Sequence, residues 1–198
     1  MKTNYVLIDY ENVQPEAMAV LNEEHFKVIV FVGANQAKVS FDVASALQQM
    51  GERAEYVRIS GNGSNALDFH IAFYIGQLAA REPDAYFHIV SKDTGFDPLV
   101  QHLKARKILA CRSKDVTEIP IVKAANSKTP SDRLTVVIAD LQRRGSAKPR
   151  TVKTLGSTIS SIFQKQLSEP DLNGLLAALE QKGVIVTTGT KVSYSLPT

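Results

Sequence analysis

YVLIDYENV, residues 5–13, is an apolar run that ends abruptly in acidic and amide side chains. Its first four residues are typical of a strand that is buried on both faces in a parallel sheet. In open α/β sheets, ligands bind outside the carboxyl ends of the strands, which is where Asp9 and Asn12 stand. The simpler interpretation is a cap for a following helix with Pro15 in its first turn, and we favour it for Asn12.

Apolar strands alternate with helical patterns from this run to about Cys111. Further strands are predicted at residues 27–32, 54–59, 85–90 and 108–111, and helices at residues 15–24, 40–50 and 66–80 and in a last stretch ending near residue 106. Short loops between them require right-handed crossovers and a sheet covered on both faces. The predicted fold class is α/β, with a five-stranded parallel Rossmann-like sheet of order 3-2-1-4-5. Strands 1 and 4 are neighbours in that order, so the switch point lies between Asp9 and Asp93.

The composition is that of an ordinary globular protein of 198 residues. A single cysteine, Cys111, excludes an internal disulfide and a Cys-rich zinc site. No apolar run approaches the roughly 20 residues that span a bilayer. The first strand begins almost at once, so we expect no signal peptide and a cytoplasmic protein without a membrane partner.

The net charge of +3 conceals an asymmetry between the two halves of the chain. Residues 1–120 contain 12 Lys/Arg and 15 Asp/Glu, whereas residues 121–198 contain 11 Lys/Arg and 5 Asp/Glu. An acidic half joined to a basic half indicates two modules, of which the basic one is suited to a polyanion.

Four aspartates are expected near the switch point. Carboxylates grouped in a dry crevice repel one another, and a divalent cation removes that repulsion. Mg²⁺ prefers such oxygen ligands, and one or two ions can support attack on a phosphate. The predicted metal ligands and catalytic residues are Asp9, Asp68, Asp93 and Asp97, with Asn12, Ser91 and Thr94 in supporting roles.

Several of these residues also have structural interpretations. Asp97 precedes a proline, as a helix cap does. Asp68 stands among apolar residues, where an unpaired charge is costly. A purely structural role is therefore harder to argue for Asp68 than for the other aspartates. Glu11 either contacts the metal through water or faces solvent. His70 is interpreted as a hydrogen-bonded helix residue and His88 as a satisfied core histidine.

Three segments carry a family resemblance: IDYENV, GNGSNALDFHIAFYIG and IVSKDTGFDPLV. They resemble the motifs of the NYN family, nucleases of the PIN-like superfamily, over residues 5 to about 113. The resemblance implies a Mg²⁺- or Mn²⁺-dependent ribonuclease, although some members bind RNA without cleaving it. One departure is Asn65, near a place where many relatives have a lysine. A dinucleotide site is not expected, because the turn after the first strand is acidic and lacks a glycine fingerprint.

The second half is predicted to be a linker at residues 121–130 followed by a small winged-helix domain at residues 131–198. Three helical patterns precede a predicted hairpin around Thr188-Gly189-Thr190. This part resembles the LOTUS (OST-HTH) module, which implies RNA binding or docking of a protein partner. Its predicted RNA contacts are Arg143, Arg144, Lys148, Arg150 and Lys153, a basic run that a solvated surface also explains.

The sequence therefore predicts a metal-dependent ribonuclease in residues 1–120 that holds RNA through its C-terminal domain. Two alternatives remain: a non-catalytic RNA-binding or adaptor protein with an acidic pocket, and a phosphatase-like or nucleotide-binding Rossmann domain. The sequence is also compatible with a protein partner that binds the C-terminal domain, and with a homodimer.

Overall fold

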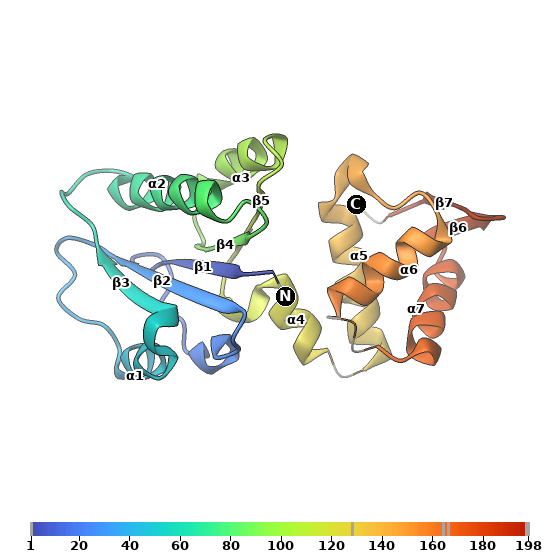
Figure 1. Cartoon of the computed structure of the whole chain (residues 1–198), viewed down its shortest axis with the longest axis horizontal. Helices are drawn as coiled ribbons and strands as arrows, with labels where there is room; N and C mark the ends of the chain where they lie inside the picture. Colours follow the sequence, from blue (N-terminus) through green and yellow to red (C-terminus); the bar gives the residue numbers. More distant parts are fainter. Residues whose placement is uncertain (1, 128, 164, 166, 197–198) are drawn as a thin grey trace. The chain divides into compact units, whose positions relative to one another are not determined.

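In the computed structural model, five parallel strands form one sheet in the predicted order β3-β2-β1-β4-β5 (Figure 1). They are β1 (Asn4–Asp9), β2 (Phe26–Val32), β3 (Ala54–Arg58), β4 (Tyr86–Val90) and β5 (Leu109–Ser113). The structure describes residues 2–127, 129–163, 165 and 167–196. The sheet belongs to the first of two compact units, Met1–Ile119 and Pro120–Thr198.

The central strand β1 is buried over its whole length. Successive side chains of a strand point to opposite faces of the sheet. Tyr5 and Leu7 belong to the core on one face, and Val6 and Ile8 are buried on the other. The same alternation places Asp9 on the face of Tyr5 and Leu7.

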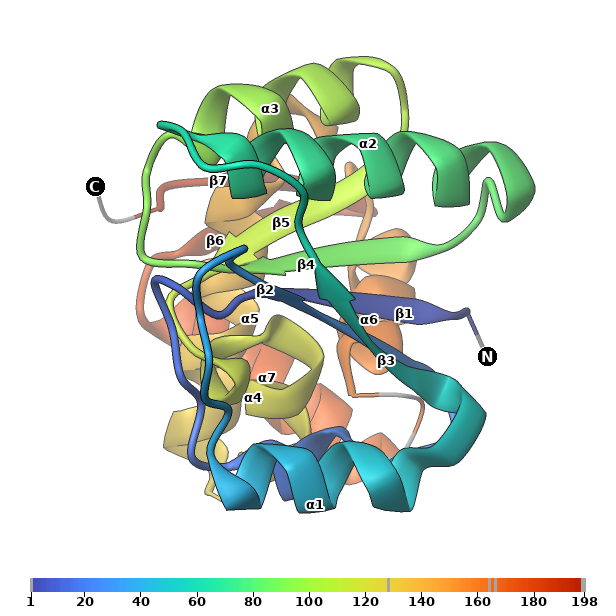
Figure 2. The same cartoon turned by 90° about the vertical axis from the view of Figure 1, so that its left-hand side faces the viewer.

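Helices cover both faces of the sheet (Figure 2). Helices α2 (Ala66–Arg81) and α3 (Phe96–Ala105) pack on the face that contains Tyr5 and Leu7, and α1 (Phe41–Met50) covers the opposite face. Each of these helices follows a parallel strand, so each begins at the edge where the strands end, here called the carboxyl edge. The crossovers therefore bring three helix starts to the edge that carries Asp9.

The helix predicted over residues 15–24 is mostly absent. Only one turn of 3-10 helix, η1 (Met18–Leu21), forms there, and its N-cap Ala17 provides no side-chain hydrogen bond. Glu23 and Glu24 follow its C-terminal end, where the helix dipole disfavours negative charge. Further 3-10 helices are η2 (Gly51–Arg53), η3 (Val116–Glu118) and η4 (Gly145–Ala147).

Most of the stretch predicted as a linker, residues 121–130, is occupied by helix α4 (Pro120–Asn126). Pro120 is the first residue of this helix, a position that the fixed φ of proline favours. Val122 and Ala124 are buried. A composition rich in Pro, Ser, Asn and Lys thus concealed a short helix with an apolar side.

The second unit continues with three helices and an antiparallel hairpin, as predicted. They are α5 (Pro130–Arg143), α6 (Val152–Ile162), α7 (Glu169–Gln181), β6 (Ile185–Thr188) and β7 (Lys191–Tyr194). Leu141, Leu155 and Leu179 are fully buried in a core of this unit. Thr129 and Asp132 form a capping box, and α5 begins directly after it at Pro130.

The segment before α6 pairs with the hairpin. The backbone N–H of Val192 in β7 donates to the carbonyl oxygen of Arg150 at 3.0 Å. Thr151 forms an isolated antiparallel bridge with Lys191. Arg150 and Lys191 are therefore carried by paired backbone segments. Over the described residues, no helix is long and apolar enough to cross a membrane.

Residues 1–119 should fold without the second unit, because the core beneath α2 and α3 is built from this unit alone. We expect a protein of residues 1–119 to give a single cooperative thermal transition by circular dichroism, with the full chain as the control. Insoluble or non-cooperative protein would show that the two units depend on each other for folding.

Candidate active site

Asp9 is the last residue of β1 and is only 1% exposed. Its Oδ2 accepts hydrogen bonds from Ser91 Oγ and from Asn12 Nδ2, each at 2.8 Å. Its Oδ1 accepts from the backbone N–H of Asn12 at 3.2 Å. These donors are neutral, so they satisfy the buried oxygens and fix their direction without cancelling the negative charge.

Asn12 does not cap a helix, contrary to the interpretation favoured from sequence. Its side chain turns back to Asp9 instead, and η1 begins six residues later at Met18. The backbone N–H groups of Asn12 and Val13 also donate to the carbonyl oxygen of Asp9. The chain after β1 is therefore a tight turn around Asp9.

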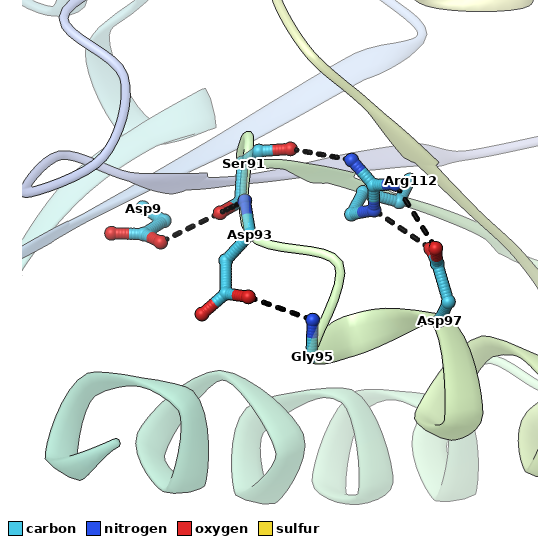
Figure 3. A network of polar contacts seen from close by, with 6 residues as sticks. All are labelled: Asp9, Ser91, Asp93, Gly95, Asp97 and Arg112. Atoms are coloured by element: carbon cyan, nitrogen blue, oxygen red, sulfur yellow. Dashed lines mark hydrogen bonds and ion pairs between the residues drawn. The ribbon is translucent and has the colours of Figure 1, made fainter. Parts of the chain in front are cut away.

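Ser91 connects the ends of β1 and β4 (Figure 3). Its buried hydroxyl donates to Asp9 and accepts the backbone N–H of Asp93 at 3.0 Å. Ser91 thus holds the Asp9 carboxylate and the backbone of Asp93 next to each other. Thr94, predicted beside it, has an exposed side chain.

Asp93 lies in the turn between β4 and α3. Its Oδ1 accepts the backbone N–H of Gly95 at 2.7 Å, which fixes the carboxylate within the turn (Figure 3). A Cβ atom at Gly95 would lie 3.1 Å from that oxygen, so a larger residue there would crowd the carboxylate.

Asp68 is half-buried in the first turn of α2. Burial raises its pKa to about 6, and the negative charges of Asp9, Asp93 and Glu11 add to the effect. The helix start next to it is set by Asn65, whose φ of 63° is left-handed, a conformation that asparagine tolerates better than most residues. Asp9, Asp93 and Glu11 are thus near enough to Asp68 to act on its charge, and we call these four residues the acidic cluster.

Glu11 is the member of the acidic cluster whose role the sequence left open. Its side chain lies against Gly33, which directly follows β2, and a Cβ atom at Gly33 would fall 1.8 Å from Glu11 Oε1. A side chain at position 33 would therefore displace the flexible end of Glu11 from this place. The sequence signal was present, because Glu11 follows the first strand by two residues and a glycine follows the second.

Asp97 has a different partner. Arg112 of β5 forms a bidentate ion pair with it, Nε to Oδ1 at 2.7 Å and Nη2 to Oδ2 at 3.1 Å (Figure 3). This hydrogen-bonded guanidinium lowers the pKa of Asp97. The capping interpretation does not hold, because α3 starts at Phe96 with Gly95 in the N-cap position. Asp97 is therefore neutralised, and it does not contribute to the shift at Asp68.

Arg112 was not identified from the sequence, in which it is one basic residue within a short strand. Besides pairing with Asp97, its Nη1 donates to the carbonyl oxygen of Ser91 at 3.1 Å. Arg112 thus holds the turn that carries Ser91 and Asp93 through one hydrogen bond. Its ion pair with Asp97 offsets most of its positive charge.

The two histidines considered from the sequence lie outside the acidic cluster. His88 is buried in β4, with Nε2 2.9 Å from Asn4 Oδ1 and Nδ1 3.3 Å from Cys111 Sγ, which agrees with a satisfied core histidine. His70 Nδ1 lies 2.7 Å from the carbonyl oxygen of Ala66 in the same helix.

The donor chemistry of the acidic cluster fits a hard divalent cation. All four side chains offer carboxylate oxygens. Burial is the main cause of the raised pKa of Asp68, and a cation would relieve the repulsion from neighbouring carboxylates that adds to it. In the part of the chain that the structure describes, no three His, Cys, Asp or Glu side chains are close enough together to hold an ion as they stand. Binding a metal would therefore require the carboxylates to move closer together.

The predicted basic run belongs to the second unit, and two of its side chains form ion pairs within that unit. Arg143 Nη2 and Arg144 Nε, the latter at 2.5 Å, both form ion pairs with the buried carboxylate of Asp140. The Lys148 ammonium lies 5.9 Å from the centre of the Tyr194 ring. Arg150 and Lys153, the remaining members, have exposed side chains.

Replacing Asp68 by Asn should stabilise the metal-free protein at neutral pH. The folded state raises the pKa of this carboxyl from 3.8 to about 6, so its ionisation destabilises the fold as pH rises through that range. We expect Asp68→Asn to melt at a higher temperature than wild type at about pH 7.5 in EDTA, with the difference shrinking toward about pH 4. Asp84→Asn, at an exposed site, is the control. An equal or lower melting temperature at about pH 7.5 would contradict the raised pKa of Asp68.

A model of the PIN domain (PIN7) matches residues 3–113. The matched segment contains the whole five-stranded sheet, the acidic cluster and the Asp97–Arg112 pair. A comparison with curated proteins gave no match. PIN domains form a nuclease superfamily. Over residues 3–113, the chain therefore belongs to the PIN domain family.

Proposed function

We propose that the first unit is a metal-dependent ribonuclease that hydrolyses phosphodiester bonds of RNA. The observation that carries the proposal is the acidic cluster at the carboxyl edge of a PIN domain. Ligands of open α/β sheets bind at this edge, next to the switch point between β1 and β4. The resemblance of the three motifs to the NYN family supports RNA as the substrate.

Asp9, Asp68 and Asp93 are the residues that would hold Mg²⁺ or Mn²⁺, with Glu11 beside them. A bound ion would generate a hydroxide nucleophile near neutral pH and stabilise the charge that develops on the phosphate. Asp9 is suited to this role, because its hydrogen bonds fix its direction and leave its charge available.

Asp97 and Arg112 act as positioning residues in this proposal. Arg112 holds the β4 turn through the carbonyl of Ser91, and Asp97 balances its charge. The hydrogen bond to Asp97 is the main cause of the raised pKa of Arg112, and the charge of Asp93 adds to it. Without Asp97, the guanidinium would be free to approach Asp93. The ion pair therefore keeps a cationic side chain from taking the place of a metal ion.

The second unit supplies the contacts that hold RNA. The acidic cluster repels a phosphate backbone until a metal is bound, so another surface is needed for binding. Lys148, Arg150 and Lys153 of the predicted run fit this role, and Lys191 joins them because its strand pairs with the segment at Arg150. The resemblance to LOTUS modules favours the same assignment.

The cleavage test uses end-labelled RNA with Mg²⁺, with Mn²⁺ and with EDTA. We expect cleavage only with metal, a loss of about hundredfold or more in Asp93→Asn, and a loss of about 10–100-fold in Ser91→Ala, which removes the group that orients Asp9. Asp84→Asn serves as the matched control. RNA that is bound but not cleaved under all conditions would instead support the adaptor function.

The salt dependence of binding tests the role of the second unit. Lysine and arginine side chains that neutralise phosphates release counterions, so log K falls with log salt with a slope of about one per contact. Changing Arg150, Lys153 and Lys191 to Ala should weaken binding to different RNA sequences about equally and flatten the slope by about two to three. Lys182→Ala is the control. An unchanged slope would assign these side chains to a solvated surface or a protein interface.

A further inference from the structure

We propose that three exposed phenylalanines, on the two helices α1 and α2 that begin at the carboxyl edge, bind the unpaired bases of a single-stranded nucleic acid by stacking. Among the described residues, the most exposed large apolar side chains are Phe41 at 82%, Phe69 at 70% and Phe73 at 65%. Exposed large apolar groups that gather near a site are typical of interaction surfaces. This inference rests on the proposed nuclease function and specifies how its substrate is held.

Phe69 and Phe73 are joined to the acidic cluster through α2. Phe69 directly follows Asp68, and Phe73 is one turn further on the same outer face, since residues four apart in a helix are neighbours. By helix periodicity, the small residue Ala72 lies between Phe69 and the Asp68 side of the helix. A strand with one phosphate at the acidic cluster can therefore place its next bases against these rings.

Phe41 occupies the corresponding place on the other face of the sheet. It is the first residue of α1, and the neighbouring Ser40 donates its backbone N–H to Tyr10 Oη at 2.9 Å. Tyr10 follows Asp9, so this contact fixes the start of α1 to the end of β1. Figure 2 shows α1 and α2 on opposite faces of the sheet. Exposed rings therefore flank the carboxyl edge on both sides.

The charge of this surface favours bases over phosphates. Residues 69–80 of α2 contain no Asp, Glu, Lys or Arg, and residues 1–120 carry a net charge of −3. Electrostatic attraction cannot hold RNA here, whereas base–aromatic stacking needs no charge and tolerates every base. Bases are available for stacking only when unpaired, so the surface selects single strands.

The experiment compares three forms of the full chain in EDTA, where the proposed cleavage cannot contribute: wild type, Phe69→Leu with Phe73→Leu, and Phe69→Trp with Phe73→Trp. The probes are a labelled single-stranded oligouridine, an abasic oligomer of the same length and an RNA duplex. Leucine keeps the surface apolar but removes the stacking face, whereas tryptophan restores it. Leu109→Ala, an exposed apolar residue at the opposite edge of the sheet, is the matched control.

We expect the leucine variant to bind the oligouridine about tenfold or more weakly, with the abasic oligomer and the duplex unaffected. The tryptophan variant should bind like wild type, with its fluorescence quenched by the bases. Phe41→Leu should show a smaller loss of the same kind. Absence of cleavage with Mg²⁺ or Mn²⁺ alongside these binding differences would overturn the nuclease function and leave the stacking surface supported.

Three results would overturn the stacking surface itself. The first is wild-type protein that does not bind the oligouridine, and the second is a leucine variant that binds it as tightly as wild type or loses the abasic oligomer equally. The third is self-association of wild type that the leucine variant loses while its RNA affinity stays the same. That last result would assign the rings to an interface between two copies of the chain.

Discussion

The first unit depends on how it accommodates a negative charge at the buried end of its central strand. Burying a carboxylate is costly unless its oxygens are hydrogen-bonded. Asp9 obtains those bonds from Asn12, three residues away, and from Ser91 at the end of the neighbouring strand. The second partner exists only because β4 lies beside β1. The hydrogen bonding of Asp9 therefore depends on the strand order that places β4 beside β1.

The sequence predicted the sheet well because its rules are local and repetitive. Buried parallel strands are continuous apolar runs, and right-handed crossovers leave few strand orders to choose from. The same reasoning made Asp9, Asp68 and Asp93 candidates for the site, since strand ends and helix starts meet at one edge. The short helix α4 was missed because composition was given more weight than its two buried residues, Val122 and Ala124.

Side-chain partners were less predictable than positions. Nothing near Arg112 in the sequence indicates Asp97, because their pairing depends on how α3 packs beside β5. The contact of the Glu11 side chain with Gly33 is likewise a tertiary contact, formed between the ends of two strands. Asp140 with Arg143 and Arg144 is different, because acidic and basic residues three and four apart on a helix are expected to meet. That pattern was available from the sequence and reduces the charge of the basic run.

The bond between Ser91 and Asp9 spans 82 positions of the chain. Contacts between residues so distant in sequence form late, because a long segment must first lose its conformational freedom. During synthesis, the first three strands are made before the partner of Asp9 exists. At that stage Asp9 has only Asn12 as a side-chain partner, and β1 lacks one of its two neighbours. The nascent chain therefore acquires an ordered acidic cluster only when β4 docks, in the same step that completes the centre of the sheet.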